Sequence, residues 1–237
     1  LKKSLIGNLG DDIITIQKAP KAATLTALSS PPTLVLIGSP RPEQFLSGFR
    51  TGVGALLPNA TGGGQTERDF LGRKVYSTPL PPSNVPGQRP EVRALTYASS
   101  GSYLALSTDA SLVEEYLRSS EGSGRSLRET PGLMEATEKV GGMGNGIFAY
   151  ENQTAVARTA FQLLKLNPKA FDQMFNPAAA AGVTSDAGSR KDWFDFSLLP
   201  PFEKVEKYFH YSVFGGNVSP DGFLFRSFSP TPPELRK

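Results

Sequence analysis

Short apolar segments rich in β-branched and aromatic residues recur along the chain, and Gly, Pro, Ser or Asp bounds each of them. A pleated, half-buried surface favours this composition, while the flanking residues favour turns. The turn signal is strongest at Ser219-Pro220-Asp221-Gly222, because Pro fixes φ, Asp hydrogen-bonds locally and Gly tolerates a positive φ. We therefore expect strands at residues 13–17, 33–38, 70–78, 92–98, 103–107 and 147–150, and a hairpin of residues 210–218 and 222–229.

The last expected strand, residues 222–229, is apolar on more than one side. Successive side chains of a strand point to opposite faces, so Phe223 and Phe225 share one face while Leu224 and Phe228 share the other. A strand that is apolar on both faces is typical of one that other elements cover on both sides. We expect such a cover here.

Between the strand-like segments, apolar residues recur at helical spacing. Asp109 precedes one of these patterns as an expected N-cap, and Ser126 and Glu129 have the spacing of a capping box. A helix is expected to stop before Pro168, because the residue before a proline disfavours helical backbone. The expected helices cover residues 42–57, 110–119, 132–140, 156–166, 169–175 and 201–209.

A strand, a polar cap and an amphipathic helix follow one another three times, at residues 33–49, 103–119 and 146–162. This mixed order predicts an α+β fold with a largely antiparallel sheet and helices packed mainly on one face. We expect a single domain, residues 1–237, and the repetition allows it to be built of two related halves, residues 1–122 and 123–237. Pro- and Gly-rich stretches predict long loops, whose role the sequence does not indicate, at residues 58–69, 79–91 and 176–192.

The composition argues against several classes of function. The 237 residues include no cysteine, which excludes disulfides, thiolate catalysis and cysteine-based metal sites. The net charge of +3 comes from scattered basic residues, so we expect no nucleic-acid partner. No run approaches the roughly 18 apolar residues that span a bilayer, so we expect no transmembrane segment. The chain begins at Leu1 without Met, which indicates a trimmed chain or a mature region whose leader has been removed.

Asp11 and Asp12 stand between a glycine turn and an apolar strand. Two carboxylates could form a metal or acid–base site, but hard cations need several oxygen ligands and no Asp-x-Asp-x-Asp loop surrounds this pair. Adjacent residues of a strand also point to opposite faces. We interpret the pair as an acid-rich turn into a strand, and we assign no catalytic residue, no metal ligand and no cofactor.

The other candidate sites also have structural explanations. His210 is the sole histidine, and the chain has no Gly-x-Ser-x-Gly nucleophile motif for it to serve. The glycine-rich residues 141–146 are expected to follow a helix and open a strand, which is the reverse of a phosphate-binding loop.

Trp193 belongs to an aromatic-rich region that could be a recognition patch, although such residues are more often core. N-glycosylation triplets, which arise often by chance, start at Asn59, Asn152 and Asn217.

Several stretches resemble one family. They are Gly10-Asp11-Asp12-Ile13, TLVLIGSPRPEQF, YLALSTDASLVEEYL, SLRETPGLMEA, LPPFEKVEKYF and SPDGFLFRSFSP. Through them the chain is similar to an uncharacterised group of exported bacterial domains, domain of unknown function 3352. The resemblance covers most of the chain and implies an α+β fold and a periplasmic, cell-envelope or secreted location. It implies no activity, since none is established for that family.

The sequence favours a non-enzymatic binding or structural module of the cell envelope or secreted space, with an unknown protein or polymer as its partner. Abundant loops and aromatic residues support this hypothesis. One alternative is a scaffold segment of a larger exported protein. The other is a hydrolase whose carboxylates are brought together by the fold, with Asp11, Asp12, Glu114, Glu115, Asp192 and Asp195 as candidates.

Overall fold

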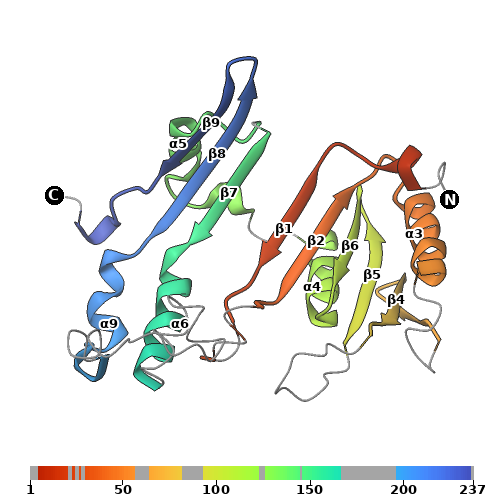
Figure 1. The fold of residues 1–237 in the computed structure, drawn as a ribbon, viewed down its shortest axis with the longest axis horizontal. Coiled ribbons are helices and arrows are strands. Elements are labelled where there is room, and N and C mark those ends of the chain that lie inside the picture. Colours follow the sequence, from red (N-terminus) through yellow and green to blue (C-terminus); the bar gives the residue numbers. More distant parts are fainter. Residues whose placement is uncertain are drawn as a thin grey trace, which may run out of the picture. The chain divides into compact units, whose positions relative to one another are not determined.

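The computed structural model describes residues 5–20, 23–24, 27, 30–56, 64–81, 93–122, 126–144, 146–166 and 196–235. The chain divides into two compact units. Leu1–Lys18 and Pro31–Gly124 form the first unit, and Ala19–Ser30 and Arg125–Lys237 form the second. Each unit contains its own antiparallel sheet (Figure 1).

Six strands form the sheet of the first unit, in the order β1-β2-β6-β5-β4-β3. Every neighbouring pair is antiparallel, which confirms the predicted α+β class and its antiparallel sheet. The strands are β1 (Ile13–Gln17), β2 (Thr33–Gly38), β3 (Thr66–Phe70), β4 (Arg73–Pro79), β5 (Ala94–Ser100) and β6 (Tyr103–Ser107).

Two helices pack against opposite faces of this sheet. Leu34 and Leu36 of β2 belong to the buried cluster that contains residues of α4 (Ala110–Glu121). Ile37 points the other way and packs with residues of α3 (Pro42–Leu56). Both alternating sets of the central strands are apolar, so both faces need a cover. We expected the helices mainly on one face, whereas each face of this sheet carries one.

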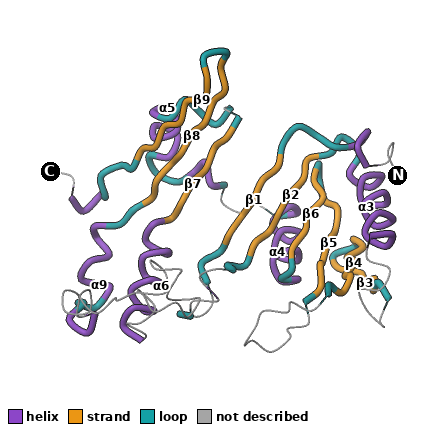
Figure 2. Tube along the Cα trace, viewed as in Figure 1, coloured by secondary structure: helices purple, strands orange, loops and turns teal. Residues whose placement is uncertain are grey.

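Three antiparallel strands form the sheet of the second unit, in the order β7-β8-β9. One face is covered by α5, whose Leu133 and Ala136 share a buried cluster with Tyr211 and Val213 of β8. Figure 2 shows β8 and β9 as a long hairpin. The elements are α5 (Leu133–Lys139), β7 (Ile147–Asn152), α6 (Gln153–Leu166), α9 (Phe202–Val205), β8 (Tyr211–Ser219) and β9 (Gly222–Phe228).

Aromatic rings join the helices that adjoin the second sheet. The Phe161 ring of α6 lies edge-on to Phe202 of α9, with 5.4 Å between centroids, and also contacts Phe209. Phe202 and Phe209 come from the aromatic-rich C-terminal region of the sequence, and these two side chains pack as expected for core residues. Short 3-10 helices complete the described chain at Ile6–Asn8, Leu127–Glu129, Phe196–Leu198, Glu206–Tyr208 and Pro233–Leu235.

The single strand expected at residues 70–78 is wrong. The chain turns at Leu71 and Gly72, whose φ angles are 51° and 69°, and Phe70 then pairs with Arg73 across the turn. A left-handed leucine is uncommon, so nothing but Gly72 signals this turn in the sequence. The segment therefore contributes to both β3 and β4.

Two of the expected long loops are partly described. Residues 66–69 were expected within the loop at 58–69, but they lie in β3, because pairing with β4 overrides their weak strand propensity. Pro79 ends β4, while most of the loop at 79–91 and all of residues 176–192 lie outside the described residues.

Several local signals are confirmed. The carboxylate of Asp109 accepts a hydrogen bond of 3.1 Å from the Ser111 N–H and so caps α4. Ser126 and Glu129 form the predicted capping box, although it starts a short 3-10 helix. The strands β1, β2 and β6 have the predicted bounds. The helix expected at residues 169–175 lies outside the described residues.

Candidate functional site

Asp11 and Asp12 do not converge on a shared site. The Tyr103 hydroxyl donates a hydrogen bond of 2.6 Å to Oδ2 of Asp12, and the carbonyl of Asp12 accepts from Gly38 N–H at 2.9 Å. Asp11 is exposed and has no hydrogen bond or ion pair with any described residue. This geometry agrees with the interpretation of the pair as the entry to a strand.

The two acids of α4 bind different cations. Glu114 accepts from Arg68 at 2.5 Å and from Arg118 at 3.2 Å, whereas Glu115 pairs with Lys18 at 2.5 Å. Within the described ranges, no group of three or more His, Asp or Glu side chains could hold a metal ion. The remaining candidate acids, Asp192 and Asp195, lie outside those ranges, as does Trp193.

His210 and the glycine-rich connector have structural positions. His210 is half-buried just before β8, and its ring centroid lies 4.4 Å from that of Tyr211. Gly142 N–H donates to the Thr137 carbonyl at 2.8 Å, which closes the end of α5. The connector therefore runs from a helix to a strand, as its position in the sequence predicted.

Two of the three glycosylation triplets lie in described structure. Asn152 ends β7, where its side chain accepts from Ala155 N–H at 3.2 Å and caps the start of α6. The side chain of Asn217 accepts from Val218 N–H at 2.8 Å within β8. Asn59 lies outside the described residues.

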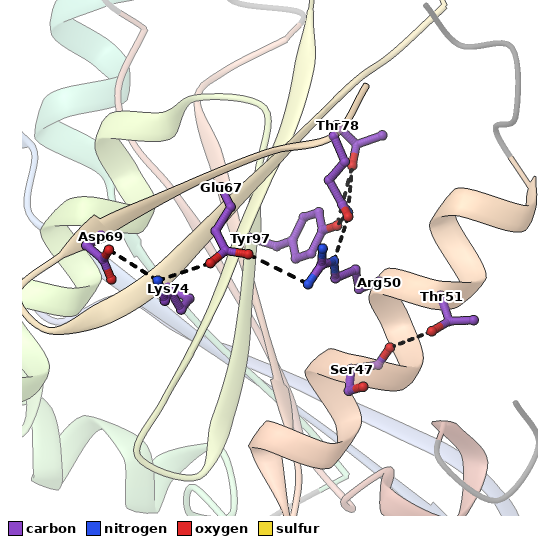
Figure 3. Close-up of polar contacts among 9 residues, drawn as sticks. Ser47, Arg50, Thr51, Glu67, Asp69, Lys74, Thr78 and Tyr97 are labelled. Atoms are coloured by element: carbon purple, nitrogen blue, oxygen red, sulfur yellow. Dashed lines mark hydrogen bonds and ion pairs between the residues drawn. The ribbon is translucent and has the colours of Figure 1, made fainter. Parts of the chain in front are cut away.

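A polar network in the first unit links α3 to the sheet (Figure 3). The fully buried Tyr97 has its hydroxyl beside Thr78 at 3.4 Å and also accepts a hydrogen bond from Gln65. Arg50 of α3 donates to Gln65 at 2.7 Å, and its guanidinium lies 4.6 Å from the centroid of the Tyr76 ring. The network thus joins a surface arginine to a buried tyrosine.

The same network continues along the surface of β3 and β4. Glu67 lies between two cations, 3.7 Å from Arg50 and 3.1 Å from Lys74, and Lys74 also contacts Asp69 at 3.2 Å. These two carboxylates raise the pKa of Lys74, with the hydrogen bond to Glu67 as the largest cause. Burial raises the pKa of Tyr97. Since each group already has a partner, we interpret the network as a structural tie between β3, β4 and α3.

A small pocket of about 150 Å³ lies in the second unit between α5 and the hairpin. Asn217 and the guanidinium-bearing Arg226 are its polar side chains, and the remaining lining residues are Val140, Gly141 and Leu224. Val140 and Gly141 directly follow α5, and Arg226 is the charged side chain among the lining residues.

The opposite face of the second sheet is apolar and exposed. In β8 and β9, Gly216 pairs with Phe225 and Val218 pairs with Phe223, so these residues share the face away from α5. Phe223 is 75% exposed and Phe225 is 55% exposed. We call this surface the aromatic face; its residues are Ile147, Phe214, Gly216, Val218, Phe223 and Phe225.

The rings of the aromatic face are ordered by contacts with one another. The Phe225 centroid lies 5.6 Å from that of Phe214 and 6.4 Å from that of Phe223, and the three rings are close to parallel. Gly216 makes room for this row, because a Cβ at that position would lie 2.9 Å from a Phe225 ring carbon. A glycine under an aromatic ring on the neighbouring strand holds the ring across the sheet.

The expected cover on both sides of β9 is wrong for the described chain, since six of its seven residues are exposed. The sequence did carry the signal for this surface, namely the apolar residues on both faces of the strand. It gave no sign that the strand is left uncovered, because cover depends on which other elements reach it.

None of the helices in the described ranges is long and apolar enough to cross a membrane. The chain matches no family model, no curated protein and no solved structure. Membership of the family that the sequence resembles therefore stays a prediction.

Proposed function

We propose that this chain is a non-enzymatic binding module that holds a protein partner against its aromatic face. One observation carries the proposal: a row of three parallel phenylalanine rings stands on a sheet face opposite the helix-covered one, and Phe223 and Phe225 are more than half exposed. Exposed apolar patches of this kind mark interaction sites more often than isolated exposed residues do.

The chemistry of the aromatic face favours a protein over a polysaccharide. Its side chains are Ile, Val and Phe, and the residues opposite Phe214 on the two neighbouring strands, Ala149 and Ser227, add one hydroxyl but no amide, guanidinium or carboxylate. Sugar hydroxyls need hydrogen-bonding groups beside the apolar contact, since unpaired polar groups are costly to bury. An apolar patch with aromatic anchors instead fits the fully buried core of a protein interface.

The contacts of the acids agree with a non-enzymatic role. Glu114 and Glu115 bind arginine and lysine side chains, and Asp12 accepts from a tyrosine hydroxyl. A pair of carboxylates for hydrolysis would have to face one another across a substrate, about 5–10 Å apart. Asp12, Glu114 and Glu115 instead contact neighbouring side chains of the described structure.

We place the module in the cell envelope or the secreted space, and this part of the proposal rests on the resemblance to exported bacterial domains. Fractionation of the source cells with an antibody against the chain tests it. The chain should accompany periplasmic, envelope or medium fractions. Recovery with the cytoplasmic fraction alone would overturn the location and leave the binding proposal standing.

The binding proposal is tested by a photo-crosslinking phenylalanine analogue at position 223. In an extract of the source cells it should label a discrete protein, whereas the analogue at position 224, on the opposite face of the same strand, should not. The labelled protein is then purified and titrated. Phe223→Ala should weaken its binding about tenfold or more, as for an interface anchor.

The matched control is Leu224→Ala, because Leu224 is exposed on the same strand and belongs to the other face. It should change the dissociation constant less than threefold, which is about 0.6 kcal/mol. Equal effects of the two variants would contradict the proposal. Labelling of glycans without any protein would also contradict it and would favour a polymer ligand.

A further inference from the structure

The two edge strands of the first sheet differ in charge. β3 carries Glu67, Arg68 and Asp69, all exposed, and charged side chains of this kind discourage pairing with another strand. β1 forms the opposite edge and contains no charged residue. All five of its side chains are exposed, with Ile13 at 67%. The β1 edge thus lacks the protection that the β3 edge has.

The backbone of β1 is arranged to accept another strand. Toward β2, the Asp12 carbonyl accepts from Gly38 N–H and Lys18 N–H donates to the Pro32 carbonyl. Hydrogen-bonding direction alternates along an antiparallel strand, so residues 12, 14, 16 and 18 face β2. The N–H and C=O groups of Ile13, Thr15 and Gln17 consequently face away from the sheet.

We propose that a second copy of this chain pairs with β1 in antiparallel orientation, with Thr15 on the two-fold axis. In this register, Ile14 lies opposite Ile16 of the second copy, and Thr15 lies opposite itself. Asp12 lies opposite Lys18 of the second copy, so that each end of the pair joins opposite charges. The surface is self-complementary, as a two-fold interface requires.

Symmetry leaves few other registers. A two-fold axis must pass through a residue pair, because an axis between pairs would map a hydrogen-bonded pair onto a non-hydrogen-bonded one. An axis at Ile14 would place Asp12 opposite Ile16, and an axis at Ile16 would place Ile14 opposite Lys18. Both registers, and likewise those with the axis at Ile13 or Gln17, set a charged side chain against an isoleucine. The register at Thr15 is the one that matches apolar with apolar and acid with base.

The contacts that Asp12 and Lys18 make within one copy are compatible with this pairing. Asp12 uses Oδ2 for the Tyr103 hydroxyl. Lys18 pairs with Glu115, and both of those side chains are about half exposed. Exposed ion pairs contribute little on their own, so the charges would select the register more than they strengthen it.

Cysteine crosslinking tests the register directly, because the chain has no native cysteine. Residues of a hydrogen-bonded antiparallel pair are about 5.5 Å apart at Cα, within the range of about 4.4–6.8 Å that a disulfide spans. Under mild oxidation, the full chain with Thr15→Cys should form a disulfide-linked dimer. Ile13→Cys alone should not, but it should crosslink when mixed with Gln17→Cys. Equal crosslinking of all three single variants would overturn the register.

Sedimentation of the full chain tests the pairing without crosslinks. The unmodified chain should show a monomer–dimer equilibrium. Thr15→Pro removes an N–H that β2 does not use and should raise the dimer dissociation constant about tenfold or more. Thr15→Val keeps the N–H and should change it less than threefold. A chain that stays monomeric at the highest soluble concentration, or dimers that Thr15→Pro leaves intact, would overturn the proposal.

Discussion

The Tyr103 hydroxyl reaches Asp12 across strand β2 and donates a hydrogen bond of 2.6 Å to its carboxylate. Gly38 of β2 stands between them, paired with Tyr103 in the sheet. A Cβ at Gly38 would collide with the Asp12 side chain. The absent side chain therefore lets a residue at the entry of β1 contact a residue two strands away.

Loss of this hydrogen bond should destabilise the first unit. We expect Tyr103→Phe to lower the free energy of unfolding by about 1 kcal/mol, a modest value because Asp12 is exposed. Asp12→Asn keeps an acceptor and should cost less. Asp11→Asn is the matched control and should change nothing, since Asp11 has no such contact. Urea unfolding measures all three, and equal losses for Asp11→Asn and Tyr103→Phe would contradict the prediction.

Alkaline pH should weaken the same contact. The hydrogen bond to Asp12, with a contribution from burial, raises the pKa of Tyr103 above its ordinary value. The unfolded chain then loses this proton first, at about pH 10, so the stabilisation is present below that pH and decreases as the pH rises further. The difference in unfolding free energy between the unmodified chain and Tyr103→Phe should shrink above about pH 10. A difference that grows with pH would contradict this assignment.

The entry to β1 should not tolerate a side chain at Gly10. A Cβ there would lie 2.7 Å from the backbone carbonyl of Gly38, and backbone atoms cannot move aside as a flexible side chain does. We expect Gly10→Ala to cost about 1–3 kcal/mol. Gly7→Ala is the matched control, because nothing lies within 4 Å of its added Cβ. Thermal unfolding of the two variants should separate them clearly; similar midpoints would rule out the steric explanation.

The buried hydroxyl of Tyr97 should contribute more than that of its neighbour. Tyr97→Phe removes its contacts with Gln65 and Thr78, and we expect a loss of about 1–2 kcal/mol. Tyr76 stacks on Tyr97 with 5.7 Å between centroids, and its hydroxyl has no hydrogen bond with a described residue. Tyr76→Phe should therefore be close to neutral. Denaturant titration of both variants checks the prediction, and a larger loss for Tyr76→Phe would refute it.

The Phe225 ring should move when Gly216 acquires a side chain. The added Cβ of Gly216→Ala would lie 2.9 Å from a ring carbon, so the ring must leave its place between Phe214 and Phe223. We expect shifted ring-proton resonances for Phe225 and weaker binding of the partner. Gly144→Ala, with open space around its Cβ, should leave both unchanged. Unshifted Phe225 resonances in Gly216→Ala would show that the ring does not depend on the glycine.

Strands made of short apolar runs were predictable from the sequence, whereas a strand that depends on pairing with its neighbour was not. β2 and β6 have the expected bounds, since their β-branched and aliphatic residues fit a buried pleated surface. β3 was not predicted, because Thr66–Phe70 is mostly charged and such a segment is typical of a loop. β3 pairs with β4 through a turn in which Leu71 has a left-handed backbone, and a leucine in the sequence does not indicate such a turn.

Only part of the candidate site could be predicted from the sequence. The apolar residues on both faces of β9 were evident, but they predicted a covered strand and not an exposed aromatic face. The network at Tyr97 was not foreseen at all, because Arg50, Gln65 and Tyr97 come from separate segments and meet only after the sheet forms. Local patterns report propensity and periodicity, whereas such contacts depend on tertiary arrangement.

The charged edge at β3 has a consequence for how far the first sheet can grow. Because the charged β3 edge discourages pairing, β1 is the edge at which this sheet can accept another strand. If two copies pair through β1, neither β1 edge remains open. The two outer edges of the joined sheet are then the charged β3 strands. Through this sheet the assembly terminates at two copies and does not propagate as a fibre. Replacing Glu67, Arg68 and Asp69 together with neutral residues would open the β3 edge to pairing and allow assemblies of more than two copies.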